Sequence, residues 1–398
     1  MVKNGFNIRT IDDNKIFGKR VILRADFDVS LNPNYTIADD VRIRNNLPTI
    51  NLLLKNKNKL ICIAKLDRPK ARDPKYSLKI VVDKLQDYLP NYKIKLVDDF
   101  LTADRRIFDD QKENEILVLE NIRFYKEEKK NDPQFAQKLA ALGDVYVNDA
   151  FAVSHRPEAS VVGIPEYLPS YAGLLLKKEV EMISQAIKKP RKPVVAILGG
   201  AKISTKIIII DKLMEIADYL LIGGGLANTF LLAEGHEIGK SFYEYEEIEK
   251  ARRLLFMAAK KHTAIILPSD VIIGDLKNTK HGGIVKKIGE ILSNANILDI
   301  GPETQAKFGS IIAQAKTIIW NGPVGYFENS EYRRGTDFIY YSITQNQKAT
   351  SIVGGGDTLS AISKKEYLDK ITHISTGGGA MLEFIEKGTL PGLEVLKA

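Results

Sequence analysis

The sequence predicts an α/β protein built from two doubly wound parallel sheets, one in each half of the chain. Its 398 residues are enough for about two domains, each with its own hydrophobic core. Short apolar runs alternate with helical patterns, which is typical of parallel strands connected by helices. The halves differ in composition, because residues 1–198 contain 5 glycines and 12 arginines whereas residues 199–398 contain 24 glycines and 4 arginines.

This difference in composition predicts two ways of holding phosphate. Glycine turns let backbone N–H groups approach an anion at a helix N-terminus. Arginine instead offers a charged planar fork that binds phosphate or carboxylate at two points. We therefore expect two anionic ligands, one for each half, that are brought together for reaction.

The first half contains five candidate strands rich in Val, Ile and Leu. They occupy residues 20–27, 59–66, 94–98, 116–121 and 145–149. Most lack strict apolar–polar alternation, which is typical of parallel strands buried on both faces. Helical patterns over residues 77–88 and 133–142 predict right-handed strand–helix–strand connections.

The second half repeats this order with glycines after each strand. Four candidate strands, each followed by a glycine pair or triplet and then a helical pattern, occupy residues 193–198, 219–222, 350–353 and 372–375. In a parallel sheet all four glycine turns would open on the same edge. The sequence contains neither GxGxxG nor GxxxxGK[ST], so neither the dinucleotide fingerprint nor a P-loop is expected.

A connection between the halves is expected around residues 169–193. Residues 169–172 are followed by a helical pattern over 174–187 and by a proline-bounded segment over 190–193. We therefore predict a first domain over residues 1–170, a hinge helix over 171–189 and a second domain over 190–387. The remaining residues, 388–398, are expected to pack back on the first domain.

Composition favours a soluble, cytoplasmic protein. The chain is 44% hydrophobic and 27% charged; it has no apolar run long enough to span a membrane and no apolar segment typical of a signal peptide. Its one cysteine, Cys62, lies in an apolar run and is expected in the core of a protein from a reducing compartment. The net charge of +8 leaves a nucleic-acid-binding or surface-binding protein as one alternative, but the lysines are scattered and no nucleic acid is expected as a partner.

Charged residues gather at the carboxyl ends of the strands predicted for the first half, where open α/β sheets bind ligands. A single arginine is more often solvated than functional, but here several cations follow neighbouring strands. Together they predict a pocket for a small, multiply charged anion. The residues are Arg24, Asp26, Asp28, Asp39, Asp40, Arg42, Arg44, Lys65, Asp67, Arg68, Glu120, Arg123, Asp149, His155 and Arg156.

In the second half, Lys202 and Lys206 follow the first glycine pair at a spacing of four. On a helix this spacing would place both ammonium groups on one face, toward the turn. Asp357 follows Gly354–Gly356 and is expected either to cap a helix or to reach a magnesium ion on a nucleotide; the two roles are compatible. The segment 320–323 is interpreted as a turn.

Eleven segments distributed along nearly the whole chain resemble phosphoglycerate kinase. They are RADFDVSL (24–31), DDVRIR (39–44), KYSL (75–78), LENIRFYKEE (119–128), VNDAFAVSHR (147–156), LGGAKISTK (198–206), GGGLANTF (223–230), LDIGPET (298–304), WNGPVGYFE (320–328), GGGDT (354–358) and STGGGAMLE (375–383). The resemblance implies two Rossmann-like domains, the first binding 3-phosphoglycerate or 1,3-bisphosphoglycerate and the second binding ATP or ADP with Mg²⁺. It also implies a monomeric cytoplasmic kinase of glycolysis that transfers a phosphoryl group in line after hinge closure.

The resemblance also implies roles for particular residues. The substrate-binding set is Asp26, Phe27, Asp28, Arg42, Lys65, Leu66, Asp67, Arg68, Arg123, His155 and Arg156. The nucleotide-binding set is Gly200, Lys202, Lys206, Gly224, Asn321, Glu328, Gly355, Gly356, Asp357 and Thr358, with Asp357 at the metal. The catalytic set is Arg42, Lys202, Gly378 and Gly379, in which Arg42 and Lys202 would flank the migrating group.

The chain departs from the family pattern in the presumed acid pocket. Lys65 stands where the family has histidine, Asp67 where it has glycine, and Asp28 where it has asparagine; Ser30 and Ala152 also differ. An unpaired Asp28 about 4 Å from an anionic ligand would cost on the order of a few kcal/mol at an effective dielectric constant near 20. We hypothesise that Lys65 compensates Asp28, and we expect Asp67 to point to solvent. These departures leave a second function open, namely a non-catalytic relative that binds nucleotide and an anion.

Overall fold

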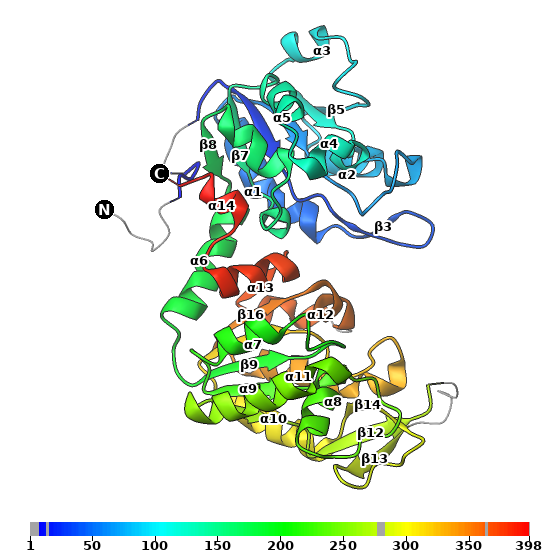
Figure 1. The fold of residues 1–398 in the computed structure, drawn as a ribbon. Coiled ribbons are helices and arrows are strands. Elements are labelled where there is room, and N and C mark those ends of the chain that lie inside the picture. The colour runs from blue at the N-terminus through cyan, green and yellow to red at the C-terminus, as the bar shows by residue number, and fades with distance from the viewer. Residues whose placement is uncertain (1–7, 13–15, 277–282, 363–364, 398) are drawn as a thin grey trace. The chain divides into compact units, whose positions relative to one another are not determined.

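The computed structural model describes residues 8–12, 16–276, 283–362 and 365–397. The chain forms two compact units (Figure 1), one comprising Met1–Glu181 with Lys387–Ala398 and the other Met182–Glu386. The boundary between them falls inside helix α6, Leu174–Lys188. Each unit is built around its own six-stranded parallel sheet, which confirms the predicted fold class.

The first sheet has the strand order β5-β6-β4-β1-β7-β8. All of its strand pairs are parallel. The strands are β1 Arg20–Arg24, β4 Lys59–Ile63, β5 Lys93–Val97, β6 Glu115–Leu119, β7 Val145–Asn148 and β8 Ser170–Ala172. The first five agree with the predicted strands, whereas β8 corrects our interpretation of residues 169–172 as connecting chain.

Helices cover both faces of this sheet. Successive residues of a strand point to opposite sides, so one strand contributes to a core on each face. Val21 and Leu23 of β1 pack in a core with α1 (Val41–Lys55) and α2 (Lys79–Tyr88). Ile22 packs in a second core with α5 (Pro133–Ala140). The remaining short elements of the unit are the hairpin strands β2 Ser30–Leu31 and β3 Ile37–Asp39 and the helices α3 Arg106–Asp109, α4 Lys126–Lys130 and α14 Pro391–Glu394.

The C-terminal segment contacts the first unit. The N–H of Gly392 donates to the carbonyl of Ser154 at 2.8 Å, and the N–H of Arg9 donates to the carbonyl of Leu396 at 2.9 Å. Gly392 also approaches Val161 so closely that an added Cβ would lie 2.8 Å from its side chain. The first unit is therefore made from two separate stretches of the chain.

The second sheet has the strand order β11-β10-β9-β15-β16-β17. All of its strand pairs are parallel, so the four predicted glycine turns open on one edge. The strands are β9 Val194–Leu198, β10 Tyr219–Ile222, β11 Ala264–Ile266, β15 Thr317–Asn321, β16 Thr350–Gly354 and β17 His373–Ser375. Strand β15 corrects the predicted turn over residues 320–323, since Trp320 and Asn321 end a central strand.

Seven helices flank this sheet in the described part of the second unit. They are α7 Ile207–Leu213, α8 Gly224–Ala233, α9 Ile248–Lys260, α10 Pro302–Gln314, α11 Arg334–Gln345, α12 Gly356–Ala361 and α13 Gly378–Lys387. Phe308 of α10 and Ile339 of α11 pack with Trp320 and Val353 in one core on the sheet.

The second unit also contains a small antiparallel sheet, which was not predicted from the sequence. Its strands are β12 Asp270–Gly274, β13 Ile284–Lys287 and β14 Asn296–Ile300, in the order β13-β12-β14. It joins the main sheet through Asp270, whose carboxylate accepts the N–H groups of Glu303 and Thr304 at the start of α10. No helix in the described ranges is both long enough and apolar enough to cross a membrane.

Candidate functional sites in the two units

The first candidate site lies at the carboxyl ends of the strands in the first sheet. Arg42, in the first turn of α1, donates to Asp26 at 2.5 Å, and Asp26 is only 2% exposed. Burial opposes the charge of Arg42, but Asp26 and Asp28 outweigh it, so the pKa of this guanidinium is raised. Arg42 is therefore held as a permanent cation next to a buried carboxylate.

A second ion pair joins the ends of β1 and β4. Lys65 Nζ donates to Asp28 Oδ2, while the N–H of Asp67 donates to Asp28 Oδ1 at 2.7 Å. Burial disfavours both charges. For Lys65 the effect of burial is larger than that of Asp28, so the pKa of the ammonium is lowered. For Asp28 burial is outweighed, chiefly by Lys65, and the pKa of the carboxyl stays below its usual value. The contact predicted from the departures in this pocket is present.

A third ion pair involves a residue that sequence analysis missed. Arg123 lies 2.7 Å from Glu158, with exposed side-chain fractions of 4% and 6%, and Arg156 lies 4.0 Å from the same carboxylate. Burial is the main cause of a lowered pKa for Arg123, and Glu158 acts against it. A glutamate two residues after His155-Arg156 was the available signal, since a buried arginine requires a carboxylate partner.

Two residues of the charged set serve the interior instead of the pocket. Arg24 is 1% exposed and donates to Ser160 Oγ and to the carbonyl of Ala25. Asp149 is fully buried and accepts the N–H groups of Leu175 and Leu176 at the start of α6. Burial raises the pKa of Asp149 to about 8.

The remaining predicted residues of the acid site differ in exposure. The side chains of Phe27 and Leu66 are fully buried in the core of the sheet, so only their backbone atoms are available to a ligand. Asp67 and Arg68 are exposed and His155 is half-buried, and Asp67 Oδ1 accepts the N–H of Arg68 at 2.7 Å. The carboxylate of Asp67 therefore lies at the surface, as expected.

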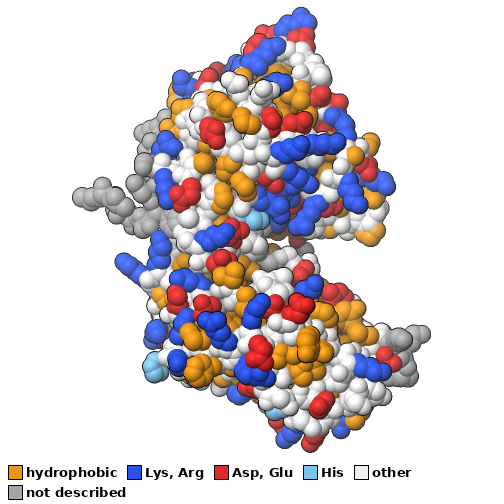
Figure 2. All heavy atoms as spheres, in the orientation of Figure 1, with side chains coloured by type: hydrophobic (Ala, Val, Ile, Leu, Met, Phe, Trp, Pro, Cys, Tyr) orange, Lys and Arg blue, Asp and Glu red, His pale blue; other side chains and the backbone are white. Residues whose placement is uncertain are grey.

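Figure 2 shows Lys and Arg side chains gathered on the visible face of the first unit, with Asp and Glu side chains among them. In the acid site Arg42, Lys65 and Arg123 are each oriented by a carboxylate, which is an arrangement suited to binding a small anion with several charges.

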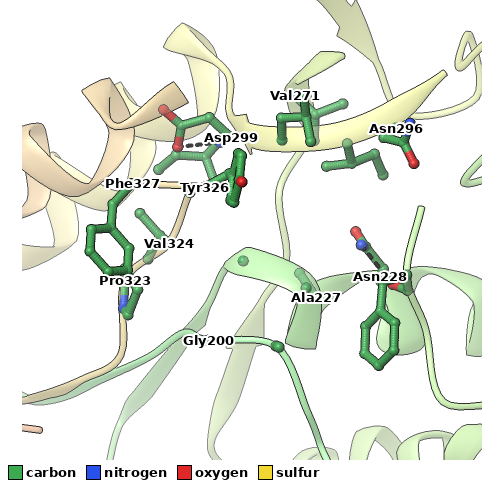
Figure 3. A pocket seen from close by; sticks show the side chains of 18 of the residues that line it. Gly200, Ala227, Asn228, Val271, Asn296, Asp299, Pro323, Val324, Tyr326 and Phe327 are labelled. Atoms are coloured by element: carbon green, nitrogen blue, oxygen red, sulfur yellow. Dashed lines mark hydrogen bonds between the residues drawn. The ribbon is translucent and has the colours of Figure 1, made fainter. Parts of the chain in front are cut away.

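The second candidate site is a cavity of about 320 Å³ in the second unit (Figure 3). Gly200, Gly224 and Asp357 line it, together with mostly apolar side chains such as Val271 and Val324. Glu328 also lines the cavity. An apolar slot lined in part by glycine turns fits a nucleotide, since the base is flat and apolar and the phosphates need backbone N–H groups.

The glycine turns cross so closely that side chains are excluded. The N–H of Gly200 donates to the carbonyl of Pro323 at 2.8 Å, and the N–H of Gly224 donates to the carbonyl of Val324 at 2.9 Å. A Cβ added at Gly199 would lie 2.0 Å from the Pro323 carbonyl oxygen, and one at Gly378 would lie 2.4 Å from Gly355 Cα. These glycines bring the turns after β9, β10, β15, β16 and β17 together.

Lys206 and Asn321 hold the centre of this edge. Lys206 Nζ donates to the carbonyl of Gly199 at 2.7 Å and to Asn321 Oδ1 at 2.8 Å, and Asn321 Nδ2 donates to the carbonyl of Gly354. Burial lowers the pKa of Lys206 to about 8. Thr358 is fully buried; its hydroxyl accepts the N–H of Gly322 and donates to Gly354.

Two predictions about this edge are wrong. Residues 201–206 form a bend and a turn, and α7 begins only at Ile207, so Lys202 and Lys206 do not share a helix face: Lys202 is exposed while Lys206 turns back toward the sheet. Asp357 is not the N-cap of α12, because Gly355 occupies that position with a φ of 114°. Asp357 lies in the first turn, exposed, beside the exposed Gly356.

The predicted magnesium site depends on the carboxylates that line the cavity. In the described ranges no group of three or more His, Cys, Asp or Glu residues is arranged to hold a metal ion. Magnesium on a nucleotide needs only one or two carboxylates, because phosphates and water supply the other ligands. The lone carboxylate of Asp357, which lines the cavity, fits that requirement.

The chain is similar to known proteins over nearly its whole length. The phosphoglycerate kinase family model matches residues 11–388. A phosphoglycerate kinase of Dictyoglomus turgidum is 45% identical over 391 residues, covering 98% of each chain, and a cytosolic phosphoglycerate kinase of Nicotiana tabacum is 41% identical over 394 residues, also covering 98% of each. The structure of phosphoglycerate kinase from Coxiella burnetii aligns with a TM-score of 0.86 at 38% identity, and that from Pyrococcus horikoshii with 0.84 at 30%, each covering 98% of both chains. The chain therefore belongs to the phosphoglycerate kinase family.

Proposed function

We propose that the chain transfers a phosphoryl group reversibly between 1,3-bisphosphoglycerate and ADP, giving 3-phosphoglycerate and ATP. The observation that carries this assignment is the pairing of a cation-rich acid site in one unit with a glycine-lined nucleotide cavity in the other. As a member of the family the chain is a kinase, and the alternative of a non-catalytic binding protein is not favoured.

In the acid site, the arginines and Lys65 hold the substrate by charge. Arg42 remains protonated beside Asp26, and Arg123 is fixed by Glu158; Arg68, His155 and Arg156 complete the set. Phosphoryl transfer asks mainly for positioning and charge neutralisation, which a rigid group of cations supplies.

In the nucleotide site, the glycine turns and two lysines have different tasks. Gly200, Gly224, Gly355 and Gly356 present backbone N–H groups to the phosphates, while Glu328 lies along the cavity for the ribose. Lys202, exposed in the bend after Gly200, is free to follow the migrating group, and Gly378 and Gly379 at the start of α13 donate N–H groups to it. Magnesium, bound through Asp357, would neutralise phosphate charge.

The two substrates bind to different units, so the units must bring them together before transfer; α6, which spans the boundary between the units, is proposed as the hinge. We also propose that the protein is a cytoplasmic monomer without nucleic-acid or membrane partners. One relative carries the word "cytosolic" in its name, and composition agrees with that compartment.

A coupled assay with 3-phosphoglycerate and MgATP tests the proposal. The wild-type protein is expected to turn over, and Lys202→Ala is expected to lower kcat by roughly 10³-fold or more, because a cation on the migrating group is removed. Lys212→Ala is the control, since Lys212 on the neighbouring helix α7 pairs with Glu215 at the surface. Equal activity of the two variants would contradict the role of Lys202, and an inactive wild type would contradict the function.

A further inference from the structure

Three departures from the family pattern are joined through one carboxylate. Both oxygens of Asp28 are used: Oδ2 accepts Lys65 Nζ and Oδ1 accepts the N–H of Asp67. The three residues come from the ends of two neighbouring parallel strands, β1 and β4, so one side chain ties the second segment to the first. Separate surface substitutions would not be expected to converge in this way.

The backbone at Asp67 needs this support. Its φ is 57°, a left-handed conformation that costs a residue with a Cβ about 1–2 kcal/mol. Aspartate tolerates it when local hydrogen bonds compensate, and here the N–H of Asp67 goes to Asp28 while its own Oδ1 takes the N–H of Arg68. Asp28 therefore fixes the turn from which Arg68 extends.

Lys65 is placed to contact an anion. It is 9% exposed, and among the described residues Asp28 is the acceptor that its ammonium reaches. An ammonium has three N–H donors, so two are left for a ligand. Burial lowers the pKa of Lys65, with Asp28 and Asp26 acting against this and Arg123 with it, so the ammonium lies within electrostatic reach of the other two ion pairs of the site.

We propose that Asp28, Lys65 and Asp67 act as one unit, in which the positioning residue Asp28 holds Lys65 as an additional cationic ligand for the acid substrate. The inference rests on the proposed function, because it assigns the acid to this site. The Asp28–Lys65 pair adds no net charge to the pocket, but it replaces a titrating ligand by a fixed cation with its own counter-ion.

The test is a double-mutant cycle on the Michaelis constant for 3-phosphoglycerate at saturating MgATP. Lys65→Met leaves Asp28 unpaired beside the anion and should raise KM by on the order of a hundredfold. Asp28→Asn keeps an oxygen for the N–H of Asp67 but removes the counter-ion that positions Lys65, so KM should rise, though less than in Lys65→Met because the ammonium itself remains. The double variant should recover at least about tenfold of the loss in Lys65→Met, since no buried charge is left unpaired.

Controls separate this role from a structural one. Lys79→Met removes an exposed lysine of α2 that pairs with Asp83 and should leave KM unchanged, and Lys65→Arg, which keeps the charge, should stay within about tenfold of wild type. KM for MgATP should be constant in all variants. Equal increases for Lys65→Met and Asp28→Asn that multiply in the double variant, or parallel changes in the nucleotide KM, would overturn the inference.

Failure of the proposed function gives a different result. If the wild type does not phosphorylate 3-phosphoglycerate, the function is wrong, and the same proteins are titrated with inorganic phosphate by calorimetry. An affinity that falls in Lys65→Met and returns in the double variant still supports the unit. Equal affinities in all four proteins overturn it.

Discussion

The two units hold anions by opposite means. In the first, three cations of the site are each oriented by a carboxylate: Arg42 by Asp26, Lys65 by Asp28 and Arg123 by Glu158. In the second, the turns at one edge of the sheet approach one another so closely at Gly199, Gly322 and Gly378 that an added Cβ would clash. A site made of ion pairs tolerates exchange of whole pairs, whereas backbone turns that cross at these glycines leave no room for a side chain.

This difference explains where the chain departs from the family pattern. Asp28 and Lys65, two of the residues that the resemblance marks as departures, form an ion pair that adds no net charge to the acid site. No such exchange is open to Gly199, because its partner is the carbonyl of Pro323 and every residue has a carbonyl. Each unit also contains one residue that can report on its unfolding. The single cysteine, Cys62, lies in the first unit and the single tryptophan, Trp320, in the second, and both side chains are fully buried.

The largest effect is expected from Gly322→Ala in the second unit. Gly322 has a φ of 98°, and an added Cβ would lie 2.4 Å from the Gly199 carbonyl oxygen and 2.8 Å from Lys206 Nζ. Overpacking and backbone strain together should cost about 4 kcal/mol, seen as a lower kcat/KM for MgATP and a lower midpoint of unfolding by Trp320 fluorescence. Gly289→Ala, at a φ of 97° in open space, is the control that carries backbone strain alone. Equal losses in both variants would show that crowding is unimportant.

The next largest effect is expected from Glu158→Gln in the first unit. Removing this carboxylate leaves Arg123 buried without a full counter-charge, which should cost about 3 kcal/mol of unfolding free energy. Labelling of Cys62 during denaturant unfolding should then begin earlier, while Trp320 fluorescence shifts less. Glu215→Gln, which frees an exposed lysine, should change stability by less than about 0.5 kcal/mol. A larger shift at Trp320 than at Cys62 would contradict the assignment of this ion pair to the first unit alone.

An effect that is smaller for each pH unit distinguishes one buried carboxyl in each unit of the chain. Burial raises the pKa of Asp149 to about 8 and that of Asp299 to about 7, so the folded protein keeps a proton that the unfolded chain loses near pH 4. Stability should therefore fall as pH rises between these values, by up to about 1.4 kcal/mol per pH unit for each group. Asp149→Asn should flatten the slope measured by Cys62 labelling up to pH 8, and Asp299→Asn the slope measured by Trp320 up to pH 7. An unchanged slope in both would show that these carboxyls titrate normally; the exposed Asp211→Asn is the control.

The smallest effect is a fraction of a proton on nucleotide binding. Because burial lowers the pKa of Lys206 to about 8, part of the population carries a neutral amine at pH 8. Phosphate next to this group favours the ammonium, so binding should take up protons, and the calorimetric enthalpy of MgADP binding should differ between buffers of different ionisation enthalpy. Inorganic phosphate, which fits the acid site, should show less of this dependence because Arg42 stays charged. Buffer-independent enthalpies would contradict the shifted lysine.

The sequence was sufficient for the fold class because buried parallel strands leave a local pattern, although β8, β11 and β15 were not predicted. The predicted strands at 20–27 and 59–66 overran β1 and β4 by a few residues, and those extra residues include Asp26 and Lys65 of the proposed acid site. The small sheet of β12, β13 and β14 was missed because its short antiparallel strands do not alternate with helices, which is the pattern that predicted the other strands.

Sequence was less informative about the direction of side chains. Arg24 and Arg42 were both predicted as residues of the acid site. In the structure Arg24 lies in the interior and donates to Ser160, whereas Arg42 donates to Asp26. Glu158 was missed because a salt bridge between the segment after β6 and the segment after β7 depends on tertiary packing. The helical spacing of Lys202 and Lys206 predicted a shared face, but residues 201–206 form a bend and a turn and α7 begins only at Ile207.

The return of residues 387–398 to the first unit has a consequence for the order of synthesis. The second unit, Met182–Glu386, is one continuous stretch, whereas the first is divided between the two ends of the chain. A growing polypeptide folds its domains in the order in which they leave the ribosome. Here the unit that is made first waits for residues 387–398, so its sheet is begun early, and the contacts of this segment with Ser154 and Arg9 form only after the second unit has been translated.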